Sequence, residues 1–156
     1  MSRVQLALNV NDLDEAVAFY SKLFGTEPAK RRPGYANFAI TEPPLKLVLM
    51  ENPGQGGSLN HLGVEVDGTG AVDAQQTRLA AAGLALADER DTTCCYAKQD
   101  KFWVKDAPDG ESWEFYTVLE DSATFYGQDD SQACCGGPAG SSAEASSETA
   151  TGRSCC

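Results

Sequence analysis

The chain has 156 residues, of which 42% are hydrophobic, which is enough for one domain or for two closely packed half-domains. Its formal net charge of −11 argues against a nucleic-acid-binding surface, because such surfaces are usually basic. No segment approaches the roughly 18 apolar residues of a membrane-spanning helix, and no signal-peptide pattern precedes the first strand-like segment. We therefore expect a cytoplasmic protein with neither nucleic acid nor a membrane as a partner.

The first half of the chain reads as a strand, a helix and three further strands. Residues 4–10 alternate apolar and polar side chains, which is typical of a strand with one buried face. Asp12 and Glu15 form a capping box that predicts the start of a helix, and Gly25 predicts its end. Further strand-like segments occupy residues 28–32, 35–40 and 45–50.

The same order of elements returns after a Gly- and Pro-rich linker around residues 51–59. The strand-like segment at residues 60–66 places His61 where the first segment has Gln5. A predicted helix at residues 70–82 and strand-like segments at residues 84–89, 96–105 and 112–118 complete the repeat.

This internal repeat determines the predicted architecture. We expect two β-α-β-β-β modules, residues 1–51 and 60–118, to pair into one α+β domain whose sheet forms a barrel-like cleft. Residues 119–156 are rich in Ser, Ala, Gly, Asp and Glu, and they are predicted to be a flexible tail because they can bury little apolar surface. The aromatic pair Phe125 and Tyr126 is the part of this tail best suited to dock on the domain.

All six cysteines occur as adjacent pairs, which predicts thiol chemistry. Adjacent cysteines cannot join distant segments, so we expect reduced dithiols that bind soft ions and not a disulfide framework. Neighbouring strand residues point to opposite faces, so two thiols can hold one ion only where the chain leaves strand geometry. We therefore expect a mobile loop at the pair inside the domain. The pairs are Cys94–Cys95, Cys134–Cys135 and Cys155–Cys156.

Two lysines follow the first cysteine pair closely. Lys98 follows Cys95 by three residues and Lys101 follows it by six. Nearby cations lower the pKa of a thiol, so either lysine could favour the thiolate. The alternative interpretation is that both are ordinary solvated lysines of a loop.

Gln5, His61 and Glu114 are the candidate residues of a metal centre. The repeat places Gln5 and His61 at matching points of the two modules. Glu114 lies between Trp113 and Phe115, so it projects from the opposite face of its strand. Each residue alone reads as an ordinary polar strand residue. Together they supply one nitrogen and two oxygen ligands with coordination positions left open, as in oxygen-activating Fe(II) enzymes.

The paired modules, with His61 and Glu114 on the second, resemble the vicinal oxygen chelate superfamily over about residues 3–118. That superfamily includes glyoxalases, bleomycin- and fosfomycin-resistance proteins and extradiol dioxygenases. The Pro108–Gly110 turn before Glu114 is similar to the motif of its last strand.

A closer local resemblance is to the arsenic-inducible carbon–arsenic lyases and their cadmium-inducible relatives. It rests on Gln5, residues 92–101, the Pro108–Gly110 turn and residues 113–116. The resemblance implies a cytoplasmic Fe(II)-dependent dioxygenase that cleaves the carbon–arsenic bond of trivalent organoarsenicals, such as methylarsonous acid and aromatic arsenicals. The product is arsenite, so the implied role is arsenic resistance.

Carried over residue by residue, the resemblance gives each candidate residue a role. Gln5, His61 and Glu114 would be the catalytic iron ligands, and Cys94 and Cys95 would bind arsenic. Dioxygen would be the co-substrate, and the protein would be a monomer or a homodimer.

Two alternative functions remain open on the sequence. A glyoxalase-like metal-dependent lyase would need a carboxylate in the last strand of the first module, and residues 45–50 contain none. A protein that sequesters arsenite or cadmium through its thiols would need no such residue, and the three cysteine pairs suit it.

Overall fold

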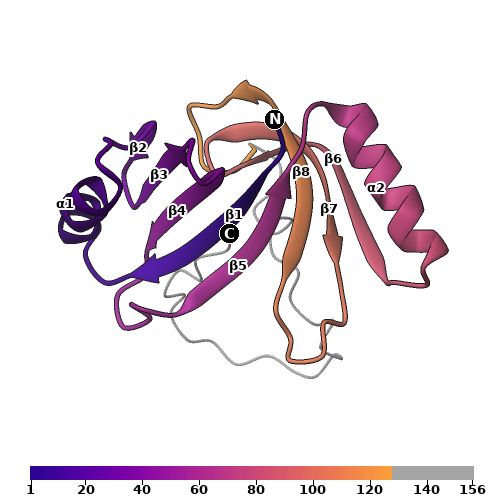
Figure 1. The fold of residues 1–156 in the computed structure, drawn as a ribbon, viewed down its shortest axis with the longest axis horizontal. Coiled ribbons are helices and arrows are strands. Elements are labelled where there is room, and N and C mark those ends of the chain that lie inside the picture. Colours follow the sequence, from indigo (N-terminus) through magenta and orange to yellow (C-terminus); the bar gives the residue numbers. More distant parts are fainter. Residues whose placement is uncertain (128–156) are drawn as a thin grey trace, which may run out of the picture.

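One sheet of eight strands organises the part of the chain that the computed structural model describes, residues 1–127 (Figure 1). The elements are β1 (Arg3–Val10), α1 (Leu13–Phe24), β2 (Lys30–Arg32), β3 (Tyr35–Ile40), β4 (Leu45–Glu51), β5 (Leu59–Glu65), α2 (Thr69–Ala81), β6 (Leu86–Cys94), β7 (Ala97–Val104) and β8 (Trp113–Asp121). The strand order in the sheet is β2-β3-β4-β1-β5-β8-β7-β6.

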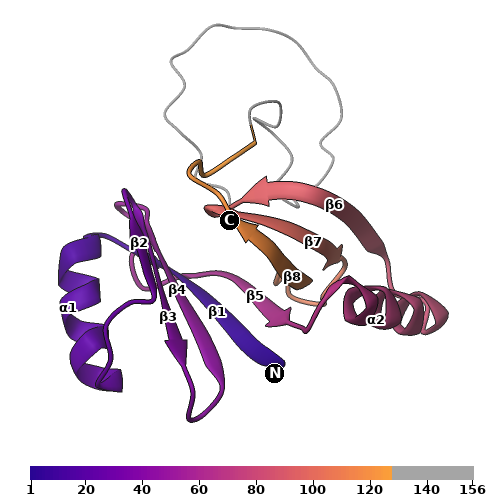
Figure 2. The ribbon, with the colours of Figure 1, turned by 90° about the horizontal axis from the view of Figure 1, so that it is seen from above.

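The two halves of the sheet have matching connections, which confirms the predicted α+β fold of two β-α-β-β-β modules. β1 pairs with β4 in parallel, and β5 pairs with β8 in parallel. β1 and β5 pair with each other in antiparallel orientation at the centre and so join the modules into one sheet. The sheet is strongly curved, and both helices lie on its outer side (Figure 2).

Helix α1 begins and ends as the sequence predicts. The Asp12 side chain accepts a hydrogen bond from the Glu15 backbone N–H at 2.9 Å, and Gly25 ends the helix in the left-handed conformation. Its buried residues, Leu13 and Val17, pack against apolar side chains of β3 and β4. Because strand side chains alternate, the polar face of these strands is left to line the inner side of the curve.

Two segments are more regular than the sequence predicts. β6 continues to Cys94, although a loop was expected around the cysteine pair. β8 continues to Asp121, three residues past the predicted end, because it pairs with β7 as far as Ala97. Among residues 1–127, no helix is long and apolar enough to cross a membrane. Cys134, Cys135, Cys155 and Cys156, with most of the predicted tail, lie outside the described residues.

Candidate active site

The structure brings Gln5, His61 and Glu114 together on the inner side of the sheet. Gln5 Nε2 lies 3.0 Å from His61 Nε2 and 2.8 Å from Glu114 Oε1. His61 Nε2 and Glu114 Oε1 are 3.3 Å apart. All three residues are buried, with 4–5% of their surface exposed. Their role as metal ligands stays a prediction.

The spacing of these three groups suits one metal ion. Ligands about 2.1 Å from an octahedral ion are about 3.0 Å from one another when adjacent, and about 3.4 Å around a tetrahedral ion. The separation of His61 Nε2 from Glu114 Oε1, 3.3 Å, falls in this range, and the two distances to Gln5 Nε2, 2.8 Å and 3.0 Å, place the Gln5 amide beside both groups. Among the described residues, no ion-sized group of three His, Cys, Asp or Glu side chains occurs. The third donor here is an amide, so the site is a mixed set of one imidazole, one carboxylate and one amide.

Gly63 makes the close approach of Gln5 and Glu114 geometrically feasible. It lies on β5 between the two residues, paired with Gln5 on one side and with Glu114 on the other. A Cβ atom at this position would be 3.1 Å from Glu114 Cγ and 3.3 Å from Gln5 Nε2. Any larger residue would therefore push the two side chains apart.

A buried lysine holds Glu114 in its ionised form. Lys101 Nζ is 3.4 Å from Glu114 Oε2 and 3.4 Å from Glu89 Oε2, and the lysine is 1% exposed. Burial by itself raises the pKa of Glu114, but the Lys101 ammonium and the hydrogen bonds with His61 and Gln5 outweigh it and hold the pKa at about 2. Glu114 is therefore a carboxylate at neutral pH, with Oε1 turned to the candidate metal position.

A chain of side-chain hydrogen bonds orients His61. Its Nδ1 lies 2.8 Å from Asn60 Oδ1, an acceptor, so Nδ1 carries a proton that it donates to Asn60. Asn60 in turn donates to Asn9 Oδ1 at 2.9 Å, and Asn9 donates to Ser58 Oγ at 2.9 Å. The imidazole also meets the Trp103 ring edge to face, with ring centres 5.5 Å apart. These contacts direct Nε2 to Gln5 and Glu114.

One cavity of about 290 Å³ connects this cluster with the cysteine pair. Both modules contribute to its wall, and Cys95 lines it together with Gln5, His61 and Glu114. The other lining residues are Arg3, Ala29, Lys30, Tyr35, Asn37, Ala39, Lys46, Val48, Glu65, Ala97, Gln99, Val118 and Asp121. The three predicted metal ligands and one of the two predicted arsenic-binding cysteines therefore line the same cavity.

Cys95 and Tyr96 form a tight two-residue turn between β6 and β7. Cys94 pairs with Ala97 across the hairpin, and the turn residues have φ values of 56° and 60°. This left-handed conformation normally favours Asn-Gly, and bulkier residues in it are strained by about 1–3 kcal/mol each. The predicted loop is therefore wrong for Cys94, which ends a strand, and right for Cys95, which leaves strand geometry. Strain of this kind is typical of functional positions.

The two sulfur atoms are in contact, and their exposure differs. Cys94 Sγ and Cys95 Sγ are 3.2 Å apart. Cys94 is fully buried, whereas Cys95 is partly exposed. That both residues are reduced thiols stays a prediction. Only Cys95 reaches the cavity.

Residues after β8 pack over the cysteine turn, as predicted for the start of the tail. The Ser122 N–H donates to the Tyr96 carbonyl at 2.9 Å, and Tyr126 forms a β-bridge with Cys94. The Phe125 ring packs against both Tyr35 and Tyr96, with ring centres 6.3 Å and 5.4 Å away. The cysteine pair is thus enclosed by aromatic side chains from three segments.

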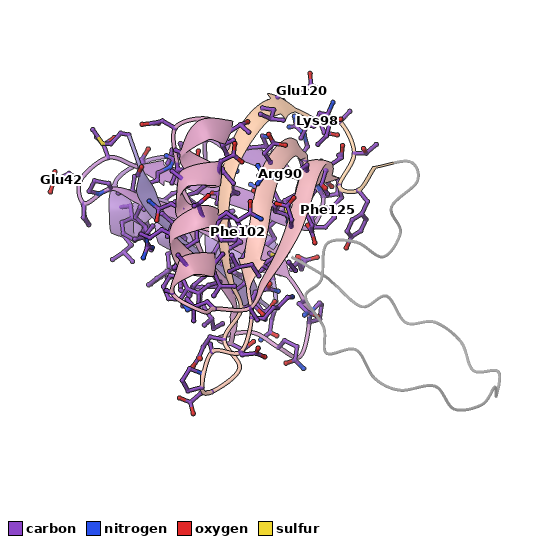
Figure 3. All side chains as sticks on the ribbon, turned by 90° about the vertical axis from the view of Figure 1, so that its right-hand side faces the viewer. Glu42, Arg90, Lys98, Phe102, Glu120 and Phe125 are labelled. Atoms are coloured by element: carbon purple, nitrogen blue, oxygen red, sulfur yellow. The ribbon has the colours of Figure 1, made fainter. Side chains whose placement is uncertain are left out.

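The two lysines near the cysteines have other partners than the thiols. Lys98 lies beside Glu120 at one end of the molecule and forms ion pairs with Asp91 at 2.8 Å and Glu120 at 3.6 Å (Figure 3). Lys101 forms ion pairs with Glu114 and Glu89. That these lysines lower the pKa of the thiols stays a prediction.

Sequence reasoning missed several residues that shape this site. Asn60 directly precedes the predicted ligand His61, and a polar residue at that position was a signal for a hydrogen-bond partner. Gly63 follows His61 by two residues, and a glycine inside a predicted strand was a signal for close packing. Tyr116 follows Glu114 by two residues on the same face, so strand periodicity could have placed it near the cluster. Nothing in the sequence marks Lys101 as buried.

Comparisons with known proteins agree with this fold. The model of the Glyoxalase/Bleomycin resistance protein/Dioxygenase superfamily matches residues 3–115. The chain is similar to the trivalent organoarsenical cleaving enzyme of Thermomonospora curvata, with 54% identity over 157 residues and full coverage of both chains. It is also similar to the cadmium-induced protein CadI of Mycobacterium tuberculosis, with 66% identity over 125 residues, 80% of this chain and 82% of that protein.

A solved structure supports the same fold. The Mn(II)-bound glyoxalase from Novosphingobium aromaticivorans matches with a TM-score of 0.55 and 24% identity. The match covers 80% of this chain and 42% of the glyoxalase chain. At this identity the likeness concerns the arrangement of helices and strands.

Proposed function

Because the chain belongs to the Glyoxalase/Bleomycin resistance protein/Dioxygenase superfamily and is similar to trivalent organoarsenical cleaving enzymes, we propose that it cleaves the carbon–arsenic bond of trivalent organoarsenicals. In this proposal Fe(II) is held by Gln5, His61 and Glu114, and dioxygen is the co-substrate. The observation that carries it is the single cavity lined by these three residues and by Cys95.

The two centres differ in the ions they prefer. An imidazole nitrogen with two oxygen donors suits Fe(II), and thiolates suit soft trivalent arsenic. Fe(II) bound at an N/O triad supplies oxygen activation at its open coordination positions. Gln5, His61 and Glu114 would hold this ion at the cavity wall that they line. A glyoxalase-like site would need a carboxylate from β4 as its fourth metal ligand. The β4 side chain that lines the cavity beside Gln5 is Lys46, a cation, which disfavours that type of site.

Cys95 binds the substrate in the proposed mechanism. Its thiol displaces one hydroxyl of the arsenical, so an As–S bond forms and water leaves. Cys94 Sγ, 3.2 Å away, displaces the second hydroxyl in the same way, so a second As–S bond forms and a second water leaves. Tethering the arsenical in the cavity removes much of the entropic cost of bringing the carbon–arsenic bond to the metal.

Tyr35 supplies a proton-bearing hydroxyl to the same space. It lines the cavity, and Asn37 donates a hydrogen bond to its oxygen at 2.9 Å. Burial, together with the nearby Cys95 and Glu114, raises the pKa of Tyr35 above its ordinary value. The hydroxyl therefore keeps its proton and can donate a hydrogen bond to an arsenical hydroxyl as it leaves during formation of an As–S bond.

The test is a single-turnover reaction with reduced protein. The protein is loaded with Fe(II) under anaerobic conditions in the presence of a thiol reductant, given methylarsonous acid and then exposed to oxygen. We expect oxygen uptake and arsenite release. Cys95→Ser should lose arsenical binding and keep Fe(II), whereas His61→Ala should lose Fe(II) and keep arsenical binding.

Thiol-based sequestration of arsenite or cadmium is the second candidate function. The similarity to a cadmium-induced protein and the position of Cys95 in a cavity favour it. In that case arsenic would stay bound in a stoichiometric amount, and oxygen uptake would not accompany the addition of the arsenical. That result would contradict the proposed cleavage.

A further inference from the structure

Every hydrogen-bonding group of the Gln5 amide is used in the structure. Nε2 faces both His61 Nε2, at 3.0 Å, and Glu114 Oε1, at 2.8 Å. Oε1 accepts a hydrogen bond from the Tyr116 hydroxyl at 2.5 Å. The amide therefore turns its N–H groups, not its oxygen, toward the position where the metal would bind.

Metal binding requires the opposite orientation of this amide. A metal ion is bound by the carbonyl oxygen of Gln, because the amide nitrogen has no available lone pair. A half-turn about the Cγ–Cδ bond brings Oε1 to the metal position and Nε2 to Tyr116. The Tyr116 oxygen must then accept a hydrogen bond from Nε2, so its proton needs another acceptor.

Glu65 is the acceptor in place. The Tyr116 hydroxyl oxygen lies 3.1 Å from Glu65 Oε2. Glu65 is held by Arg3, whose Nε is 3.0 Å from Oε2, and by Lys46, whose Nζ is 3.4 Å from Oε2. An ionised carboxylate only accepts hydrogen bonds, so it draws the Tyr116 proton away from Gln5.

We propose that Tyr116 and Glu65 are positioning residues that determine which atom of Gln5 faces the metal. Without metal, the Tyr116 hydroxyl donates to Gln5 Oε1. With metal, Tyr116 accepts from Gln5 Nε2 and donates to Glu65. The inference rests on the proposed metal site. It explains why the buried Tyr116 hydroxyl contacts both the Gln5 amide and the Glu65 carboxylate, although Glu65 is already paired with two cations.

The first test compares the Co(II) affinities of the unaltered protein, Glu65→Gln and Glu120→Gln. In Glu65→Gln the new amide donates a hydrogen bond to the Tyr116 oxygen. The Tyr116 hydroxyl then continues to donate to Gln5 Oε1, which favours the metal-free orientation of the Gln5 amide. We expect Co(II) affinity to fall about tenfold, in the range seen when groups behind a ligand are changed. Glu120→Gln, which removes the same charge at an exposed position, is the control. Circular dichroism verifies that each variant is folded.

Tyr116→Phe separates hydrogen bonding from simple charge. The ring and its contact with Lys46 remain, and only the hydroxyl is lost. If Glu65 acts through this hydroxyl, Glu65→Gln has no further effect on Co(II) affinity in the Tyr116→Phe background. An equal tenfold loss in both backgrounds would show a charge effect alone and overturn the inference, as would unchanged affinity in Glu65→Gln.

The second test observes the amide directly. In labelled protein, the Gln5 side-chain NH₂ protons should show nuclear Overhauser effects to His61 without metal and to the Tyr116 ring with diamagnetic Zn(II). Retained proximity to His61 after Zn(II) binding would overturn the inference while leaving the metal site intact. Failure of the unaltered protein to bind either ion would overturn the metal site and, with it, the inference.

Discussion

Gln5 and Glu114 lie on strands separated by β5, and yet Gln5 Nε2 is 2.8 Å from Glu114 Oε1 because the residue between them, Gly63, has no side chain. Neighbouring strands are about 4.8 Å apart, so residues on β1 and β8 start nearly 10 Å from each other. Their long side chains lean over Gly63 and meet above it.

Replacing Gly63 should therefore open the site. In Gly63→Ala the new methyl group would lie 3.1 Å from Glu114 Cγ, and we expect the affinity for Co(II) or Fe(II) to fall at least about tenfold. Isothermal titration measures the affinity. Gly70→Ala is the matched control, because no atom lies within 4 Å of its added Cβ. Equal affinities for the two variants would show that the space above Gly63 is not needed.

Asn60 should matter through the tautomer of His61. Asn60→Ala removes the acceptor for Nδ1–H, so the imidazole can turn or move its proton to Nε2. We expect metal affinity to fall about 10- to 100-fold. Asn60→Asp keeps an acceptor at this position and should retain most of the affinity. If the Ala and Asp variants lose the same affinity, the role of Asn60 is in packing only.

Lys101 should stabilise the fold through Glu114 and Glu89. Lys101→Met leaves these carboxylates without their cation, and we expect a loss of about 3–5 kcal/mol in the free energy of unfolding at pH 7. Denaturant titration measures the loss. Lys105→Met, which removes a cation beside the same Trp103 ring, is the control and should cost much less.

The effect of Lys101 should depend on pH in a defined direction. The pKa of Glu114 in the folded protein, about 2, lies below its ordinary value of 4.5. Its ionisation therefore contributes fully to stability above about pH 4.5, and the contribution is lost as the pH falls toward 2. The stability difference between Lys101→Met and the unaltered protein should shrink over that interval. A difference that stays constant from pH 7 to pH 3 would contradict this assignment.

The strained turn gives a prediction that separates thiol chemistry from backbone conformation. Cys95→Gly and Cys95→Ser both remove the thiol, but only glycine adopts a φ of 56° without steric cost. We expect the Gly variant to be more stable than the Ser variant by about 1 kcal/mol in thermal unfolding. Both should fail to retain the arsenical. A Gly variant that is less stable than the Ser variant would show that the turn is not strained.

The sequence by itself determined the architecture and the identity of the candidate ligands. Alternating side chains and a repeated order of elements are local properties, so the two modules and the positions of Gln5 and His61 followed from them. The alternation around Glu114 likewise predicted correctly which face of β8 it occupies, because Trp113 and Phe115 must turn the other way.

Only the tertiary structure decided what surrounds these residues. The approach of Gln5 to Glu114 depends on Gly63, which becomes their neighbour only when β1, β5 and β8 pair. The sequence does not mark Lys101 as buried, and sheet pairing buries it beside Glu114. Cys95 reaches the same cavity because a two-residue turn closes the hairpin at that point. Long-range strand pairing sets all three relationships, and no local pattern in the chain encodes which strands will be neighbours.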